Sequence, residues 1–268
     1  MRNTLPICIL VIISLFLFSG QSLAGPFGLN ITIWDKMGSN PLENENNEVE
    51  PGDIQAQKWD LEGFFLNGNS LTMIGGFDFL NGASDGTNTW LGGDIFISTN
   101  PGSVIYGNPP VNNSPTFGYT HVFDMDYDNL TYQLYGITQN TVLSNVHFSQ
   151  NAGSNPYQYV GGGTLITSGS FQFSDNPDLT GLGLQPWYNH GPDTHYSLMV
   201  DLTFLPQDTD FLAHFTEQCG NDTLVGWGQT PGSDPAVPEP TTIALVGTGL
   251  IAIIGFGRYK RSRSNSAS

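Results

Sequence analysis

The stretch HYSLMVDLTF, which runs from His195 to Phe204, carries the pattern that decides the fold class of this chain. Large apolar or aromatic side chains occupy every second position, and most of the positions between them are polar. The alternating apolar set is Tyr196, Leu198, Val200, Leu202 and Phe204. Successive side chains of a β-strand point to opposite faces, so this period of two predicts a strand with one face against a core.

Short apolar runs of the same kind recur along the chain between turn-forming residues. The runs cover residues 31–34, 59–66, 71–79, 95–97, 123–127, 132–137, 165–173 and 211–215. Asn81-Gly82, Asp85-Gly86 and Pro101-Gly102 are typical of the turns between them. Away from the two termini the sequence has no amphipathic helix pattern. We therefore predict an all-β protein, with one antiparallel β-sandwich or jelly roll over residues 25–236 and an acidic loop at 36–56.

The charge of this predicted body is strongly negative. All but one of the twenty-four acidic residues lie between residues 25 and 236, and only Lys36 and Lys58 oppose them. Nucleic-acid binding depends on clustered lysine and arginine, so the composition excludes a nucleic-acid partner. Solubility or the binding of divalent cations fits this charge better.

The C-terminal segment combines three features in a fixed order. Val237-Pro238-Glu239-Pro240 comes first, and its prolines favour an extended strap because proline fixes φ and disfavours helix at the preceding residue. The uncharged stretch from Thr241 to Gly257 would form a helix of roughly 25 Å, close to the thickness of a bilayer core. A basic stop follows, made of Arg258, Lys260, Arg261 and Arg263. This order predicts a transmembrane helix at about 241–257 with a cytoplasmic end. The alternative is a buried core helix followed by a charged turn.

The ordered triplet resembles the PEP-CTERM sorting domain of Gram-negative bacteria. The resemblance covers residues 237–263 and leaves a polar tail at 264–268. It implies recognition of the motif by an exosortase-like processing enzyme at the inner membrane, and a link to exopolysaccharide and biofilm production. The segment from Cys219 to Asp222, with the sequence CGND, is also similar to one found before the sorting signal in many proteins of this kind.

The N-terminus has the pattern of a secretory signal. Arg2 supplies a positive charge, an apolar stretch runs from Leu5 to Phe18, and small residues precede a cleavage point between Ala24 and Gly25. We expect a signal peptide at 1–24; the alternative is an uncleaved anchor. Both alternatives carry the body across the inner membrane, and a membrane-anchored precursor would then reach the cell envelope or the exterior.

Three acidic residues, Asp124, Asp126 and Asp128, alternate with large apolar residues. Side chains two apart on a strand share a face, and carboxylate oxygens are ligands that calcium prefers. The residues that follow lack the glycine and glutamate of an EF-type loop. The two interpretations are a calcium site and the solvated face of an ordinary strand. No other cofactor is expected.

Cys219 would be the one cysteine of the mature body, since Cys8 lies in the signal. A thiol near His214 and Asp222 suggests a nucleophile, a metal ligand or an attachment point. His214 and Cys219 are five residues apart, however, which on a strand places them on opposite faces. The structural interpretation is that Cys219 packs as a small hydrophobe beside a turn.

Trp59 to Gly63 and Gly93 to Ile97 are similar in style to segments of carbohydrate-binding or DOMON-like sandwiches, which implies the same fold and a role in sugar binding. Several aromatic residues lie in glycine- and asparagine-rich contexts where rings either stack on sugars or pack into the core. These residues are Trp90, Tyr157, Tyr159, Trp187 and Tyr188.

The sequence contains no Gly-x-Ser-x-Gly, His-Glu-x-x-His, phosphate-loop or Cys-x-x-Cys motif. We therefore expect a protein that is not an enzyme, exported to the cell surface or the extracellular matrix. The alternative is an extracellular glycan-binding or glycan-active module, because the two carboxylates of a glycosidase are paired in space rather than in sequence.

Overall fold

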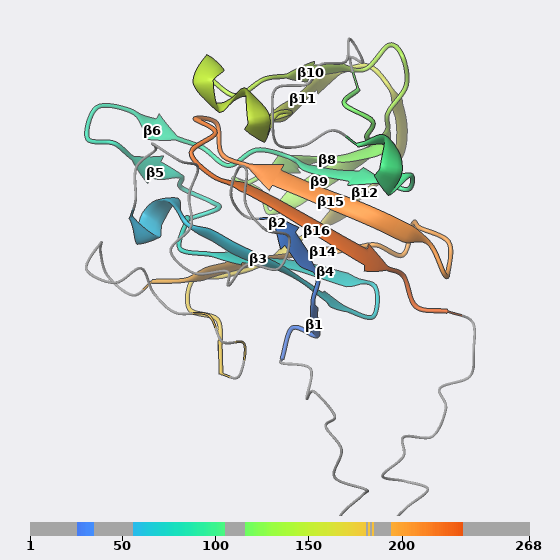
Figure 1. Ribbon diagram of the computed structural model, residues 1–268, viewed down its shortest axis with the longest axis horizontal. Coiled ribbons are helices and arrows are strands. Elements are labelled where there is room, and N and C mark those ends of the chain that lie inside the picture. The colour runs from blue at the N-terminus through green and yellow to red at the C-terminus, as the bar shows by residue number, and fades with distance from the viewer. Residues whose placement is uncertain are drawn as a thin grey trace, which may run out of the picture. The chain divides into compact units, whose positions relative to one another are not determined.

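Two antiparallel sheets face each other across an apolar core (Figure 1). The computed structural model describes residues 26–34, 56–104, 116–180, 182, 184 and 194–232. Every strand pair in these segments is antiparallel. The predicted antiparallel β-sandwich is thus confirmed.

The smaller sheet has five strands in the order β1-β3-β4-β14-β13. Their bounds are Leu29–Asn30 for β1, Leu61–Asn67 for β3, Ser70–Gly75 for β4, Tyr196–Asp201 for β14 and Gln172–Ser174 for β13. The alternating stretch that predicted a strand forms β14, in which Leu198 and Val200 are buried. The strand ends at Asp201 because the chain turns there, with the N–H of Leu205 donating to the carbonyl of Leu202 at 2.9 Å.

The larger sheet has seven strands in the order β12-β9-β8-β7-β15-β16-β2. Their bounds are Thr164–Ser170 for β12, Thr131–Gly136 for β9, His121–Asp126 for β8, Ile95–Ser98 for β7, Asp210–Thr216 for β15, Thr223–Gln229 for β16 and Thr32–Trp34 for β2. Two small ribbons complete the described strands: β5 at Ala83–Ser84 with β6 at Thr89–Trp90, and β10 at Val142–Ser144 with β11 at Gln158–Gly161.

The described helices are three short 3-10 segments: η1 at Gln57–Trp59, η2 at Pro101–Ser103 and η3 at Ser149–Ser154. Within the described segments, no helix has the length and apolar character needed to cross a membrane. The predicted signal peptide with its Ala24–Gly25 cleavage point, residues 36–55 of the acidic loop, and the sorting signal with its helix at 241–257 lie outside the described residues.

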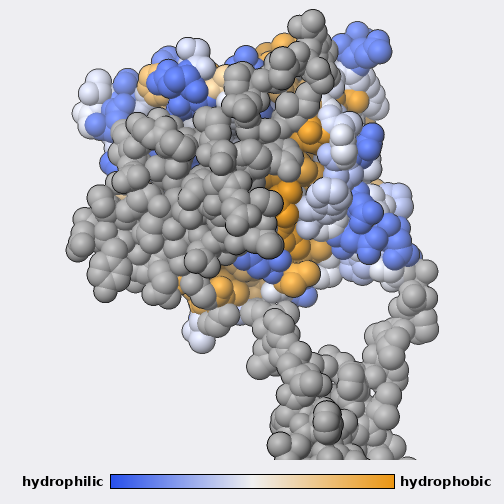
Figure 2. Space-filling model, in the orientation of Figure 1, coloured by the Kyte–Doolittle hydropathy of each residue, from blue (hydrophilic) through white to orange (hydrophobic). Residues whose placement is uncertain are grey.

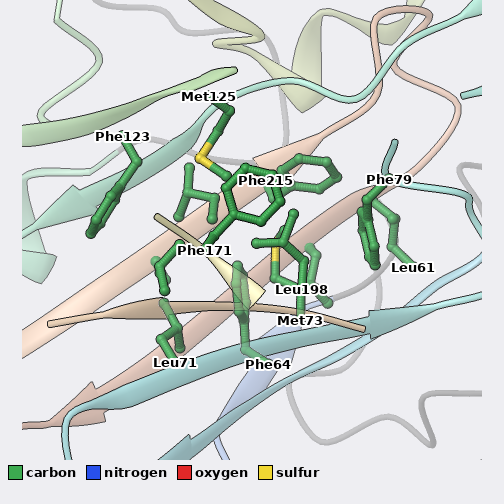
Figure 3. Close-up of a cluster of buried hydrophobic side chains, with 14 of the residues drawn as sticks. Leu61, Phe64, Leu71, Met73, Phe79, Phe123, Met125, Phe171, Leu198 and Phe215 are labelled. Carbon is green, nitrogen blue, oxygen red and sulfur yellow. The ribbon is translucent and has the colours of Figure 1, made fainter. Parts of the chain in front are cut away.

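The main core lies between the two sheets, where large side chains from both meet (Figure 3). Phe64, Met73 and Leu198 come from the small sheet, and Phe123 and Phe215 come from the large one; all five are fully buried. Burying an aromatic or aliphatic side chain of this size contributes roughly 1.5–3 kcal/mol, so this layer is the main source of stability.

The outer face of the large sheet is also covered near its centre. Phe96, Val122, Leu212 and Val225 pack there beneath Tyr119, and all four residues of β7 are buried. The central strands therefore lie between two apolar layers. On the face seen in Figure 2, the described surface is largely hydrophilic, with apolar residues forming a stripe.

Candidate functional site

Two segments far apart in the sequence, Trp59 to Gly63 and Glu217 to Asp222, meet inside the sandwich. One carboxylate oxygen of Asp222 accepts the backbone N–H of Leu61 at 2.7 Å. The other accepts the N–H of Thr223 at 2.7 Å. Leu61 begins β3 in the small sheet and Thr223 begins β16 in the large one, so this fully buried carboxylate joins the two sheets.

The Gly93-Asp94 segment joins the same region through backbone contacts. The N–H of Gly93 donates to the carbonyl of Thr216 at 3.0 Å, and the N–H of Gln218 donates to the carbonyl of Leu91 at 2.9 Å. A Cβ on Gly93 would lie 2.6 Å from the carbonyl oxygen of Thr216, so only glycine fits this close approach. The three segments singled out in the sequence are therefore neighbours in space.

Asp94 is a buried carboxyl group that holds two other strands. Its oxygens accept the N–H of Met125 at 2.9 Å and the N–H of Tyr159 at 2.7 Å. Burial raises the pKa of Asp94 to about 8, against the opposing effect of these two donors. Nearby, the hydroxyls of Tyr127 and Tyr157 donate to the backbone carbonyls of Gly93 and Gly92.

A second buried polar group lies at the start of β3. The Nε2 atom of His195 is 2.9 Å from Oε1 of Glu62, and the side-chain amide of Gln57 donates to the same oxygen at 2.9 Å. Glu62 is fully buried and His195 is 8 % exposed. A buried carboxylate needs such partners because its transfer out of water is costly.

Cys219 lies in the turn between β15 and β16, where hydrogen bonds to neighbouring residues hold the turn in place. Its thiol donates to Glu217 at 3.4 Å, and Asn151 donates to its carbonyl at 3.1 Å. The hydroxyl of Ser154 donates to the carbonyl of Gly220 at 3.2 Å. Burial, followed by the charge of Glu217, raises the pKa of the Cys219 thiol far above its usual range. The thiol therefore keeps its proton at neutral pH and is a poor nucleophile.

The structure separates His214 from Cys219. The imidazole of His214 packs against Phe96 and Tyr119, and its Nε2 lies 3.0 Å from the carbonyl oxygen of Pro156. Cys219 packs instead into the main core between the sheets. Burial lowers the pKa of His214 to about 4, so the ring is neutral at pH 7. The two side chains do not form a catalytic pair.

The three aspartates proposed for calcium do not share one strand face. Asp124 and Asp126 lie on β8, which ends at Asp126, and Asp128 lies in the following turn. The Asp126 carboxylate accepts the backbone N–H of Asn129 at 3.1 Å and its side-chain amide at 2.8 Å. No group of three or more His, Cys, Asp or Glu side chains in the described segments has an arrangement suited to a metal ion. The choice between a calcium site and the solvated face of a strand stays a prediction.

A cleft of about 330 Å³ opens beside this turn. Asp126 and Asp128 line its acidic part, and Leu80, Leu91 and Met125 line its apolar part. The arrangement offers carboxylates beside an apolar floor.

Of the five aromatic residues proposed as sugar platforms, three lie in the described part of the chain, and two of these are buried. Trp90 is 8 % exposed, and its indole N–H donates to Asp85 at 2.9 Å. Tyr157 is buried, and Tyr159 stacks on Tyr135 with ring centroids 4.5 Å apart. Trp187 and Tyr188 lie outside the described residues. Among the Phe, Tyr and Trp residues of the described part, Trp227 is exposed, at 49 %. The sequence feature that could have indicated this exposed ring is its position between two glycines, Gly226 and Gly228.

Sequence reasoning also missed the role of the buried acids. Glu62 and Asp94 are surrounded in the sequence by apolar residues and glycine, an unusual place for a carboxyl group. This apolar context could have indicated that the two carboxyl groups are buried. The partners of these groups are distant in sequence, so their function as backbone acceptors was not predictable from it.

The fold is an antiparallel β-sandwich. Its buried polar groups Asp94, Asp222 and Cys219 make hydrogen bonds inside the protein. Comparison with protein families found a match at residues 236–261 to the PEP-CTERM protein-sorting motif. The chain therefore carries a PEP-CTERM sorting motif, which supports an exported protein that an exosortase-type enzyme processes. No curated protein and no solved structure matched the chain, and the DOMON-like resemblance is not confirmed.

Proposed function

We propose that this chain is a non-catalytic protein of the cell envelope or of an exopolysaccharide matrix. The N-terminal signal exports it, the apolar segment at 241–257 holds it in the inner membrane, and Pro238-Glu239-Pro240 presents an extended strap to an exosortase-like enzyme. The sorting motif at 236–261 is the observation that carries the proposal.

The chemistry of the sandwich supports a non-catalytic role. Asp94 and Asp222 each accept two backbone N–H groups, and both are buried. Cys219 keeps its proton, and His214 packs among aromatic rings. Catalytic groups need access to substrate, and these groups are buried with structural partners instead.

The sorting step can be tested by replacing both prolines of the motif with alanine, with an epitope tag on the protein. Since alanine permits helix where proline does not, the Pro238→Ala/Pro240→Ala variant should stay in the inner-membrane fraction. The matched control is Pro231→Ala/Pro235→Ala, which changes two prolines just outside the matched motif and should be sorted normally. Normal release of the motif variant would refute the proposal.

A second candidate function is glycan binding. A groove of about 310 Å³ lies on the outer face of the small sheet, and its lining includes hydroxyl and amide side chains beside apolar ones. The residues that carry this candidate are Phe27, Thr72, Gln172, Ser174, Ser197 and Met199. Sugars are recognised by hydrogen-bonding groups together with apolar surface, which is the combination found here.

A glycan array and a polysaccharide-degradation assay on the full chain in detergent distinguish the two candidates. Binding that Gln172→Ala weakens, and that Gln229→Ala at an exposed position of β16 leaves unchanged, would support the groove as a glycan site. Degradation of a polysaccharide would refute the non-catalytic role. An array without binding would remove the second candidate.

A further inference from the structure

Strand β12 forms one edge of the large sheet and is exposed on both faces. It pairs with β9 on one side, and no described strand pairs with its other side. Six of its seven residues are exposed, and the remaining one, Gly169, is half-buried. Alternate residues of an edge strand point their N–H and C=O groups away from the sheet, so β12 presents unpaired backbone groups to solvent.

This edge lacks most of the devices that keep edge strands apart. Its sequence, TLITSGS, contains no charge and no proline. One bulge lies between Leu165 and Thr167, and beyond it Thr167 to Ser170 pair in regular register with β9. Proteins usually protect exposed edges with lysine, proline or bulges along the strand. The regular stretch of β12 is therefore open to pairing.

The surroundings of β12 differ in charge from the rest of the protein. The chain has a net charge of −17, yet no Asp, Glu, Lys or Arg occurs from Asn129 to Ser174. This uncharged segment also supplies five of the eight large hydrophobic residues that are exposed in the described part. They are Leu130, Val142, Val160, Leu165 and Ile166. Two copies of an acidic protein repel each other over most of their surfaces, and this segment is where that repulsion is weakest.

We propose that two copies of the chain associate through β12, which pairs antiparallel with its own counterpart about a two-fold axis close to Ser168, in the middle of the regular stretch. The large sheet would then continue from one copy into the other. An antiparallel pair of identical strands is self-complementary, which is the requirement for a symmetric dimer. The partner is a second copy because two acidic copies can approach each other with the least repulsion where both surfaces are uncharged and apolar, and β12 lies in that part of the surface.

Sedimentation of the full chain in detergent micelles, over a range of protein concentrations, tests the proposal. We expect a dimer that dissociates on dilution. Ser168 is exposed and pairs with Gln133, so a charge there should leave the core intact. In Ser168→Glu two like charges meet near the axis, which should weaken dimerisation by about fivefold. The control Thr87→Glu adds the same charge in an exposed turn and should leave the dimer unchanged.

Two further variants separate edge pairing from general electrostatics and from contacts made by the membrane segment. Ser168→Lys lowers the net negative charge of the protein but still places like charges across the axis, so it should also weaken the dimer. Ser168→Cys in a Cys8→Ser background should form a disulfide between copies under oxidation, and Thr87→Cys should not. A wild-type monomer at all concentrations, a dimer unaffected by Ser168→Glu, or a dimer strengthened by Ser168→Lys would each overturn the proposal.

Discussion

At the scale of single residues, Asp94 shows how a buried carboxyl group links structure to pH. It is 1 % exposed, and its oxygens hold the backbones of β8 and β11 through Met125 and Tyr159. Its pKa of about 8 in the folded protein exceeds the ordinary value of 3.8. The folded state therefore retains a proton that the unfolded state releases between these two values.

This difference predicts that the free energy of unfolding falls as pH rises. A group whose pKa is raised by folding stabilises the protein below its unfolded pKa, and that contribution is lost as pH approaches the folded pKa. His214, with a pKa lowered to about 4 from 6.5, acts in the opposite direction between pH 4 and 6.5. The two effects oppose each other there, so the net decline should lie between pH 6.5 and 8 and amount to about 2 kcal/mol.

Urea unfolding of the full chain at several pH values measures this decline. In Asp94→Asn the decline above pH 6.5 should disappear, and the free energy of unfolding should fall as pH drops below 6.5 because Asp94 no longer opposes the effect of His214. Asp128→Asn makes the same substitution in an exposed turn and should keep the wild-type profile. A decline above pH 6.5 that persists in Asp94→Asn would contradict the assignment.

The aspartates around the β8–β9 turn give a second prediction at this scale. The Asp126 carboxylate already accepts two donors from Asn129, and Asp128 lies beyond the strand. We therefore expect the same melting temperature for the full chain in EDTA and in calcium. Circular dichroism on heating measures it, and a lower Tm in EDTA that Asp126→Asn abolishes would establish a calcium site here instead.

At the scale of elements, β16 depends on two glycines that face inward. A Cβ on Gly226 would lie 2.9 Å from Phe64, and one on Gly228 would lie 2.9 Å from Phe211. Between them, Trp227 points outward and is exposed. The glycines allow β16 to approach β3 of the other sheet closely, because no side chain intervenes.

Gly226→Ala should therefore destabilise the protein by about 1–3 kcal/mol, the usual cost of overpacking a core. Urea unfolding measures this change. Gly102→Ala is the matched control, since a Cβ there meets no atom within 4 Å, and its effect should be small. Equal stability of Gly226→Ala and the wild type would show that the two sheets are not in close contact at β16.

The sequence predicted strands that carry large apolar side chains in alternation or in runs, and it missed β16, where glycine replaces them. β14 was predicted from its alternation, and β3, β4, β7, β9 and β15 were predicted from apolar runs. β16 was missed because Gly226 and Gly228 interrupt its hydrophobic pattern. Glycine carries no hydrophobic signal, although here it occupies core-facing positions.

At the scale of the whole molecule, the two sheets are joined by their apolar core and by Asp222. The hydrogen bonds of its carboxylate to Leu61 and Thr223 link a strand of each sheet. Asp222→Ala would leave both N–H groups buried without this acceptor. We expect a loss of about 2–5 kcal/mol in the free energy of unfolding.

Asp175→Ala, at an exposed position, is the control and should change stability by less than about 0.5 kcal/mol. Urea unfolding of both variants makes the comparison. If Asp222→Ala cost no more than the control, the apolar core alone would hold the sheets together.

The sequence by itself determined the class of fold and the sorting signal, because both are written in local patterns. Alternation with a period of two follows from strand geometry, and the order of proline motif, apolar stretch and basic residues is read along the chain. Only the tertiary structure decided the roles of Asp222, Glu62 and Cys219. Leu61 and Asp222, for example, are 161 residues apart. A carboxyl group acquires its role from the donors that surround it, and the folded sandwich is what brings those donors together.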